Sequence, residues 1–318
     1  MRTCAVLTVR DEGAFLIDWL AHHRACGITD FLVFSNDCRD GTDAMLDRLA
    51  ALGWITHIRN DGPHAQGPQW AALRTASAHP ALTGADWAMV LDIDEYLNIH
   101  TGDRTIAALT AALPQATAIA LQWRLFGNDG VEGIADIPVT HRFTRAAPRV
   151  LHWPWRAQMV KTLWRPGGAF RRAGVHRPRQ PDPARIGQER WFDGSGRPLP
   201  PEFLKGRLFL NLGQDNVALA QINHYALGSM EDFLLKCDRG RANRDAAAFD
   251  AGYWLERNFA ATEDTSIHAM DPRSAPLRDA LRADPDLARL HAAALDWRRA
   301  RLADLLAEEP WRAFLGRL

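Results

Sequence analysis

Strand-like and helix-like segments alternate along the first 125 residues, and this alternation limits the fold more than any other feature. Strands are predicted at the apolar runs 4–9, 30–35, 53–58, 86–91 and 117–123. Helices are predicted at 14–24, 42–52, 69–79 and 105–113. Such alternation is typical of βαβ units, so we expect an α/β fold with a mostly parallel central sheet flanked by helices. Ligands of these sheets bind at the carboxyl ends of the strands.

The rest of the chain has a different pattern. Residues 145–201 are rich in Pro, Arg, Gly and Trp, which predicts a loop-rich insertion. A strand is expected at 217–225, a helix capped by Ser229 follows it, and the tail at 284–309 is predicted to be helical. We therefore divide the chain into a main domain, residues 1–245, and a helical C-terminal extension, residues 246–318.

Charge is balanced overall but unevenly distributed. The chain has 38 basic and 38 acidic residues, and a net charge of zero argues against a nucleic-acid partner. Between Arg145 and Arg185, however, ten Lys or Arg residues accompany one acid, Asp182, so this segment carries +9 and the remainder −9. We expect the segment to meet an anionic partner.

The four cysteines have no paired spacing, which indicates a reducing compartment, and the cytoplasm is the simplest prediction. The apolar run at the N-terminus is too short for the core of a signal peptide. No run approaches the ~20 apolar residues that span a bilayer. Membrane contact is therefore expected to be peripheral at most, which leaves the inner membrane face open as a location.

Asp92 and Asp94 form a D-x-D string directly after the predicted strand 86–91. Carboxylates at i and i+2 of an extended segment point to the same side, so both can reach one divalent cation, or one can bind a ribose hydroxyl. A solvated turn is the alternative for these residues. His224 ends the late strand, and mixed carboxylate and imidazole ligation suits Mn²⁺. A core or surface histidine is the alternative there.

The first two strands also end in polar residues, at 8–12 and 35–42, which can bind a base, although Asp40 is better explained as a helix cap. Motifs of three other classes are missing from the sequence. It has no glycine-rich dinucleotide motif, no P-loop and no G-x-S-x-G elbow. A Rossmann dehydrogenase, a P-loop enzyme and the usual hydrolase are therefore not supported.

Several ordered segments together resemble one family. They are TVRDEGAFLIDWLAHHRACGI from Thr8, FSNDCRDGT from Phe34, LDIDEYL from Leu91, WRLFGNDG from Trp123, HRFTR from His141 and INHYALGSMEDFLLKCDRGR from Ile222. Gln69, Lys161 in KTLWRP and His176 in GVHRP continue the series. On these residues the chain resembles GT-A-fold glycosyltransferases of the family 2 type, and more narrowly the branch related to family 92. The resemblance extends over residues 1 to about 245 and implies a GT-A-like catalytic domain.

The resemblance also implies roles for single residues. Asp92 and Asp94 match the motif that holds a divalent metal, Mn²⁺ or Mg²⁺, against the diphosphate of a nucleotide sugar, and His224 matches a further metal ligand. The nucleotide-sugar site would include Thr8, Arg10, Glu12, Asp37, Gln69 and Asp92. The cationic partners for phosphate or acceptor would be Lys161, His176, Lys236 and Arg239. For these four, a solvated or salt-bridged surface residue is the alternative.

Family 2-type enzymes invert the anomeric centre, which needs one base and no covalent intermediate. Our candidate for this catalytic base is Asp129, in the loop after the fifth predicted strand. Glu132 and Glu95 are its rivals. A turn-forming Asn-Asp-Gly is the alternative explanation for Asp129.

Two further groups of residues have open interpretations. Trp123, Trp153, Trp155 and Trp164 fit either sugar stacking or core packing. In the tail helix, Arg298, Arg299 and Arg301 follow Trp297 and can meet an anionic membrane that carries a lipid-linked acceptor. Packing of this helix against the main domain is the outcome we expect.

We therefore predict a metal-dependent, inverting glycosyltransferase that moves a hexose from a nucleotide sugar to a glycan or lipid-linked acceptor in surface polysaccharide synthesis. Two alternatives stay open. One is a glycan-binding relative without catalytic activity, and the other is a nucleotidyltransferase, which would release pyrophosphate instead of a nucleoside diphosphate.

Overall fold

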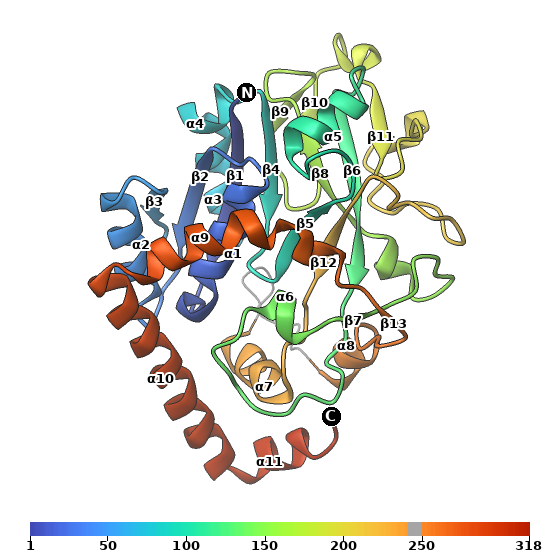
Figure 1. Ribbon diagram of the computed structural model, residues 1–318. Helices are drawn as coiled ribbons and strands as arrows, with labels where there is room; N and C mark the ends of the chain where they lie inside the picture. Colours follow the sequence, from blue (N-terminus) through green and yellow to red (C-terminus); the bar gives the residue numbers. More distant parts are fainter. Residues whose placement is uncertain (241–249) are drawn as a thin grey trace.

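The computed structural model describes residues 1–240 and 250–318. The predicted domain boundary at residue 245 and the end of the last matched segment, Arg241, lie outside these ranges. A nine-stranded mixed sheet forms the centre of the described chain (Figure 1). Its strand order is β3-β2-β1-β4-β8-β6-β12-β5, with β11 paired to β6.

The N-terminal part confirms the predicted alternation. Its elements are β1 (Thr3–Val9), α1 (Gly13–Ala25), β2 (Asp30–Ser35), α2 (Thr42–Ala51), β3 (Thr56–Arg59), α3 (Pro68–Ala78), α4 (Pro80–Thr83) and β4 (Trp87–Leu91). The four strands pair in parallel. Every residue of β4 and all but one of β1 are buried, as expected for the centre of a parallel sheet that helices cover.

The next part of the chain contains a strand that the sequence did not predict. β5 (Glu95–Ile99) begins immediately after the acidic motif and runs antiparallel to β12 (Ala220–His224). Between them in sequence lie α5 (Ile106–Ala112) and β6 (Ala118–Leu125), and β6 pairs in parallel with β12. The acidic motif is therefore a tight turn between two strands, which brings it beside the end of β12.

The prediction of a loop-rich insertion at 145–201 is wrong for its central portion. β8 (Val160–Trp164) is fully buried in the sheet, antiparallel to both β4 and β6. The other elements of this segment are short: β7 (Arg145–Ala146), η1 (Trp155–Gln158), β9 (Phe170–Arg172), β10 (Arg179–Pro181), η2 (Ile186–Gln188) and β11 (Trp191–Asp193). The charged Lys161 inside VKTLW interrupted the apolar pattern of β8 in the sequence. In the structure, its side chain is buried with acidic partners.

The C-terminal part is mainly helical and packs on the sheet domain. Its elements are η3 (Pro201–Phe203), α7 (Met230–Arg239), α8 (Ala251–Leu255), β13 (Thr262–Glu263), η4 (Ser266–Met270), α9 (Asp271–Arg282), α10 (Pro285–Ala307) and α11 (Glu309–Leu315), while α6 (Val139–Arg142) lies earlier in the chain. Ser229 caps α7 as predicted, since its hydroxyl accepts the backbone N–H of Asp232 at 3.0 Å. α9 packs along α1, and α10 contacts α1, α2 and α7 (Figure 1).

Ion pairs tie the tail helix to α7. Arg298 lies 2.7 Å from Asp232, and Arg301 lies 2.6 Å from Asp238. The expected packing is thus confirmed, and the structure engages these two arginines with protein carboxylates. Within the described ranges, no helix combines the length and the apolar character that a membrane span requires.

Candidate active site

A cleft of about 510 Å³ opens at the carboxyl ends of β1, β4 and β12. It brings together many of the residues that the sequence analysis singled out: Thr8, Arg10, Glu12, Gln69, Asp92, Asp94, His176, His224, Lys236 and Arg239. Parallel strands end at one edge of a sheet, which explains why segments so distant in sequence converge here. The predicted location of ligand chemistry, at the carboxyl edge of the sheet, thus coincides with this cleft.

A buried lysine pairs with two carboxylates of the acidic motif. The Nζ of Lys161 is fully buried, 2.8 Å from Oδ2 of Asp92 and 3.0 Å from Oε2 of Glu95. Burial disfavours the charged ammonium, but these two carboxylates outweigh it and raise the pKa of Lys161. The structure does not bring Lys161 to the cleft surface, so it holds Asp92 in place and cannot contact a donor phosphate directly.

Glu95 is equally inaccessible and accepts three hydrogen bonds. Its donors are Lys161, the backbone N–H of Asp92 at 2.9 Å and the indole N–H of Trp123 at 2.7 Å. Burial raises the pKa of Glu95, and the charge of Lys161 opposes that shift. A carboxylate with three fixed donors is suited to orienting Asp92 and Trp123. It does not suit the role of a base that meets substrate.

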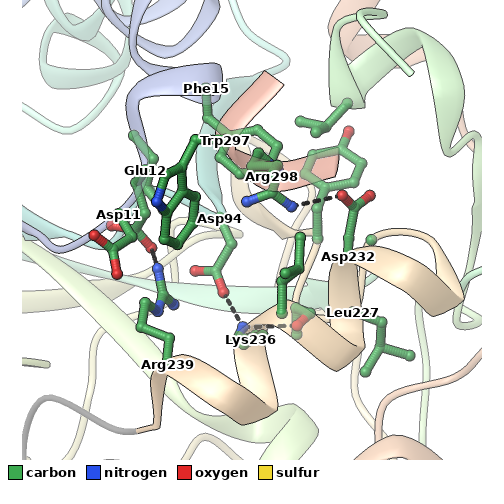
Figure 2. A pocket seen from close by; sticks show the side chains of 16 residues that line it. Asp11, Glu12, Phe15, Asp94, Leu227, Asp232, Lys236, Arg239, Trp297 and Arg298 are labelled. Atoms are coloured by element: carbon green, nitrogen blue, oxygen red, sulfur yellow. Dashed lines mark hydrogen bonds and ion pairs between the residues drawn. The ribbon is translucent and has the colours of Figure 1, made fainter. Parts of the chain in front are cut away.

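Asp94 is the charged carboxylate that faces the cleft interior. Its Oδ2 lies 2.7 Å from Nζ of Lys236, and its Oδ1 lies 3.7 Å from Nε2 of His224. Burial acts to raise the pKa of Asp94, but the charge of Lys236 outweighs burial and holds it well below its ordinary value. Figure 2 shows Asp94 directed toward Lys236 on α7. Asp94 is therefore ionised over the whole neutral range.

The residues fit a divalent cation in part. The 3.7 Å between Asp94 and His224 allows both to bind one ion, and burial lowers the pKa of His224, so that its ring is neutral as ligation requires. The buried Nδ1 of His224 has no hydrogen-bond partner among the described residues. Asp92 is engaged instead by Lys161 at 2.8 Å and Gln69 at 3.1 Å. By distance, the pair that fits a cation is Asp94 with His224, and a place for Asp92 in such a site stays a prediction.

His176 has a different character from the cation that the sequence predicted. Its Nδ1 lies 3.1 Å from the carbonyl oxygen of Val160, which can only accept, so Nδ1 carries the proton. Burial, assisted by the charge of Lys161, lowers the pKa of His176 to about 4. The ring is therefore neutral near pH 7. Its Nε2 is a hydrogen-bond acceptor in a residue that lines the cleft.

Lys236 and Arg239 lie one turn apart on α7 and are two of the cations that line the cleft, together with Arg10, Arg156 and Arg257. Arg239 forms an ion pair with Glu12 and donates to the backbone oxygen of Arg10 at 3.0 Å. Behind Asp94 lies a smaller cavity of about 70 Å³, which is lined partly by Trp297 of α10 (Figure 2). The sequence did not predict that the tail helix contributes to this region, because no local pattern shows which face of the domain the helix covers.

Besides Lys161 and Glu95, three predicted residues lie outside the cleft lining. Asp37 is exposed, and its side chain accepts from the backbone N–H of Gly62 at 3.2 Å. Asp129 is exposed in a turn with a φ of 52°, and Glu132 is also exposed. The turn is closed by Gly130, whose N–H donates to Asn128 at 2.9 Å. The placement of Asp129 therefore agrees with the turn interpretation and does not support its role as the base.

Some cations of the positive segment 145–185 have their counter-charges within the protein. Arg149 pairs with Asp215 at 2.9 Å and Arg156 with Glu256 at 2.6 Å, while Lys161 pairs with Asp92 and Glu95. These three cations are thus neutralised by the protein itself, and an external anion for the rest of the segment stays a prediction. Of its tryptophans, Trp164 is buried, whereas Trp153 and Trp155 are exposed.

A second cluster of metal-type side chains, His141, His268 and Asp271, lies outside the cleft. The two imidazole rings are stacked, with centroids 4.4 Å apart and planes inclined by 8°. Because ring nitrogens bind metals in the plane of the ring, two stacked rings cannot direct their lone pairs at one ion without rotating. We therefore assign no metal to this cluster.

Together, the fold and the cleft define an α/β protein with an ionised carboxylate, a neutral imidazole and two cations at the carboxyl edge of its sheet. Residues 4–184, more than half of the chain, match the family model of glycosyltransferase family 92. The chain belongs to this family. The finer prediction, a branch of the family 2 type, stays a prediction.

Individual relatives are distant and longer. The chain is similar to a glycosyltransferase family 92 protein of Ricinus communis, with 26% identity over 104 residues, covering 31% of this chain and 17% of the relative. A family 92 protein of Oryza sativa subsp. japonica is 22% identical over 147 residues, covering 44% of this chain and 24% of the relative. The matches thus span less than a quarter of the length of either relative.

Solved structures show weaker similarity. S. aureus TarS 1–349 in complex with UDP-GlcNAc is 12% identical at a TM-score of 0.32, covering 93% of this chain and 89% of TarS 1–349. The complex of the same protein with UDP is 12% identical at a TM-score of 0.33, covering 52% and 47%.

Proposed function

We propose that this protein is a glycosyltransferase that takes a hexose from a nucleotide sugar. The observation that carries the proposal is the pairing of ionised Asp94 with Lys236 and His224 inside the cleft. This arrangement can bind a diphosphate together with a cation, and membership of family 92 supports glycosyl transfer as the reaction.

Within this proposal, Thr8, Arg10 and Glu12 contact the base and ribose from the end of β1. The diphosphate lies against Lys236 and Arg239, whose charges stabilise it as the sugar leaves. Donor binding then replaces Glu12 as the partner of Arg239. A divalent cation, Mn²⁺ or Mg²⁺, would be held by Asp94 and His224 and would neutralise the leaving diphosphate.

The acceptor hydroxyl must lose its proton as it attacks the anomeric carbon. His176 replaces Asp129 as our candidate for the group that receives this proton. Its neutral Nε2 belongs to a cleft-lining residue, and the bond from Nδ1 to Val160 fixes the ring orientation. One such group without a covalent intermediate corresponds to inversion at the anomeric centre.

The acceptor side of the proposal is a glycan or a lipid-linked glycan in surface polysaccharide synthesis, in the cytoplasm. The catalytic interpretation is favoured over the nucleotidyltransferase because the family model that matches is a glycosyltransferase model. Product analysis separates the two, since a glycosyltransferase releases a nucleoside diphosphate and a nucleotidyltransferase releases pyrophosphate.

The test is thermal unfolding with UDP, GDP or dTDP, each with and without MnCl₂. We expect at least one nucleoside diphosphate to raise the melting temperature, and more so with Mn²⁺, because a ligand that binds only the native state stabilises it. The absence of a shift with all three nucleotides in the presence of metal would overturn the proposed donor site.

A further inference from the structure

Two tryptophans of one short segment are exposed to an unusual degree, and one of them, Trp155, lines the cleft. Trp153 is 60% and Trp155 is 50% exposed, whereas Trp19, Trp87, Trp123 and Trp164 are at most 7% exposed. They flank a single proline in the WPW sequence, at the start of η1. Large exposed apolar groups close together on a soluble surface usually mark a contact site.

Trp155 connects this exposed segment to the cleft, while Trp153 lies outside the cleft lining. Trp155 lines the cleft with Arg156, Met159 and Phe209, and its ring packs against Phe209 at 4.6 Å with planes inclined by 70°. Trp153 packs against Phe259 at 6.4 Å. We call Trp153, Trp155 and Phe209 the aromatic rim. Because Phe209 fixes the indole of Trp155, a ligand would meet a preorganised surface there.

Two arginines of the segment that carries the tryptophans are paired with carboxylates. Arg156 lies over the ring of Trp155 at 5.0 Å and forms a 2.6 Å ion pair with Glu256. Arg149 is paired with Asp215 at 2.9 Å. Paired charges give little attraction for an anionic membrane, which needs unneutralised cations. They do offer both donors and acceptors to a ligand that carries hydroxyl groups.

We infer that the aromatic rim is the binding site for a neutral saccharide, the ring of the acceptor that lies next to the transferred sugar. The apolar C–H face of a pyranose packs on the indoles of Trp153 and Trp155, while its hydroxyls bind Arg156 and Glu256. This inference rests on the proposed function, because it makes the cleft next to the rim the donor site. His176 and Trp155 line the same cleft, so the rim and the proton acceptor face one space.

The experiment is saturation-transfer difference NMR on the full chain with the methyl glycosides of glucose, galactose, mannose and N-acetylglucosamine. At least one glycoside should receive saturation at its ring C–H protons. Trp155→Ala should weaken that binding by about fivefold or more, since one stacked face is lost. Trp153→Ala provides a second variant at the more exposed position. The matched control is Leu52→Ala, because Leu52 is a 40% exposed apolar residue at the end of α2 and outside the cleft lining.

Each result then supports or overturns the inference. Signals that both tryptophan variants lose and Leu52→Ala retains support it. No signal from any of the four glycosides, or signals unchanged in both tryptophan variants, overturns it. Co-sedimentation of the wild type with phosphatidylglycerol vesicles that both tryptophan variants abolish also overturns it, because the rim would then be a membrane surface. UDP binding by the wild type is measured separately, so a failed donor site is distinguished from a failed saccharide site.

Discussion

The two sides of the cleft differ in whether their side chains are paired within the protein or exposed to solvent. The inner side, which we call the charged wall, consists of Glu12, Asp92, Asp94, Lys236 and Arg239 and keeps each carboxylate against a cation. The aromatic rim, in contrast, leaves Trp153 and Trp155 half or more exposed. Burying a charge without a partner costs free energy, so the charges of this wall are paired with one another or with neighbouring residues when no ligand is bound. The rim contains no buried charge that needs a partner, so its tryptophans can stay exposed when no ligand is bound.

This difference means that the two sides should respond differently to mutation. Residues of the charged wall contribute both to folding and to function, because their ion pairs are largely shielded from water, with Asp92 the most exposed of them at 35%. Residues of the rim should affect ligand binding with little effect on stability. The predictions below test this contrast, beginning with the change that should have the largest effect.

Removal of the buried ammonium should be the most damaging change. Lys161→Met leaves Asp92 and Glu95 without their shared cation, and we expect a loss of about 3–5 kcal/mol in the free energy of unfolding. Guanidinium chloride unfolding followed by circular dichroism measures it. Arg171→Met is the matched control, since its 3.0 Å pair with Asp182 involves a side chain that is 70% exposed and should cost less than about 1 kcal/mol. Equal losses in both variants would show that burial does not distinguish these pairs.

The second prediction concerns the carboxylate that faces the cleft. Asp94→Asn removes the charge opposite Lys236 and His224, and sugar transfer or donor hydrolysis should fall by about 10²–10³-fold with loss of its dependence on Mn²⁺. Steady-state rates with and without EDTA provide the measurement. Asp129→Asn should retain most of the activity, because Asp129 is in an exposed turn. A comparable loss in Asp129→Asn would restore it as the base.

A smaller effect on rate is expected at His176. His176→Gln retains a polar side chain but removes the Nε2 acceptor, and kcat should fall by about 10–100-fold while the affinity for nucleoside diphosphate changes little. Kinetics of transfer, combined with calorimetric titration of UDP, separates these quantities. His141→Gln, in the exposed cluster outside the cleft lining, is the control. Weakened UDP binding in His176→Gln would instead place this residue on the donor side.

The mildest prediction is a dependence of stability on pH that does not involve the cleft. Burial lowers the pKa of His22 on α1 from 6.5 to about 4. Below pH 6.5 the unfolded chain therefore binds a proton that the native chain refuses, so stability falls as the pH falls. At pH 5 this costs about 2 kcal/mol for His22 alone. Unfolding curves at pH 7.5 and 5 should show a smaller difference in His22→Asn, and an unchanged difference would contradict the assignment.

Much of the sheet could be predicted because its signals are local. Periodic apolar runs marked β1, β2, β4, β6 and β12, and the polar residues after them converge at one edge of the sheet. This is why Asp92, Asp94 and His224 were found without a structure. β5 and β8 were both missed because charged residues interrupt their apolar patterns. The start of β5 was hidden in the acidic motif, and the lysine in β8 interrupted a run that is otherwise apolar.

The roles of charged side chains were predicted less well. Lys161 and His176 were expected to bind anions as cations. Instead, Lys161 is buried against Asp92, which lies 69 positions away in the sequence, and the ring of His176 is neutral near pH 7. Asp129 was chosen from a short loop motif, and no sequence signal shows that this loop turns away from the cleft.

The sequence by itself determined the α/β architecture, the acidic strand end and the family, because each depends on the order and spacing of residues along the chain. Tertiary structure alone decided which charges are neutralised and which tryptophans are exposed. The partners of Lys161, Arg149 and Arg156 lie 69, 66 and 100 positions away. A side chain's pKa and exposure depend on such distant neighbours, and only the folded chain brings them within a few ångströms.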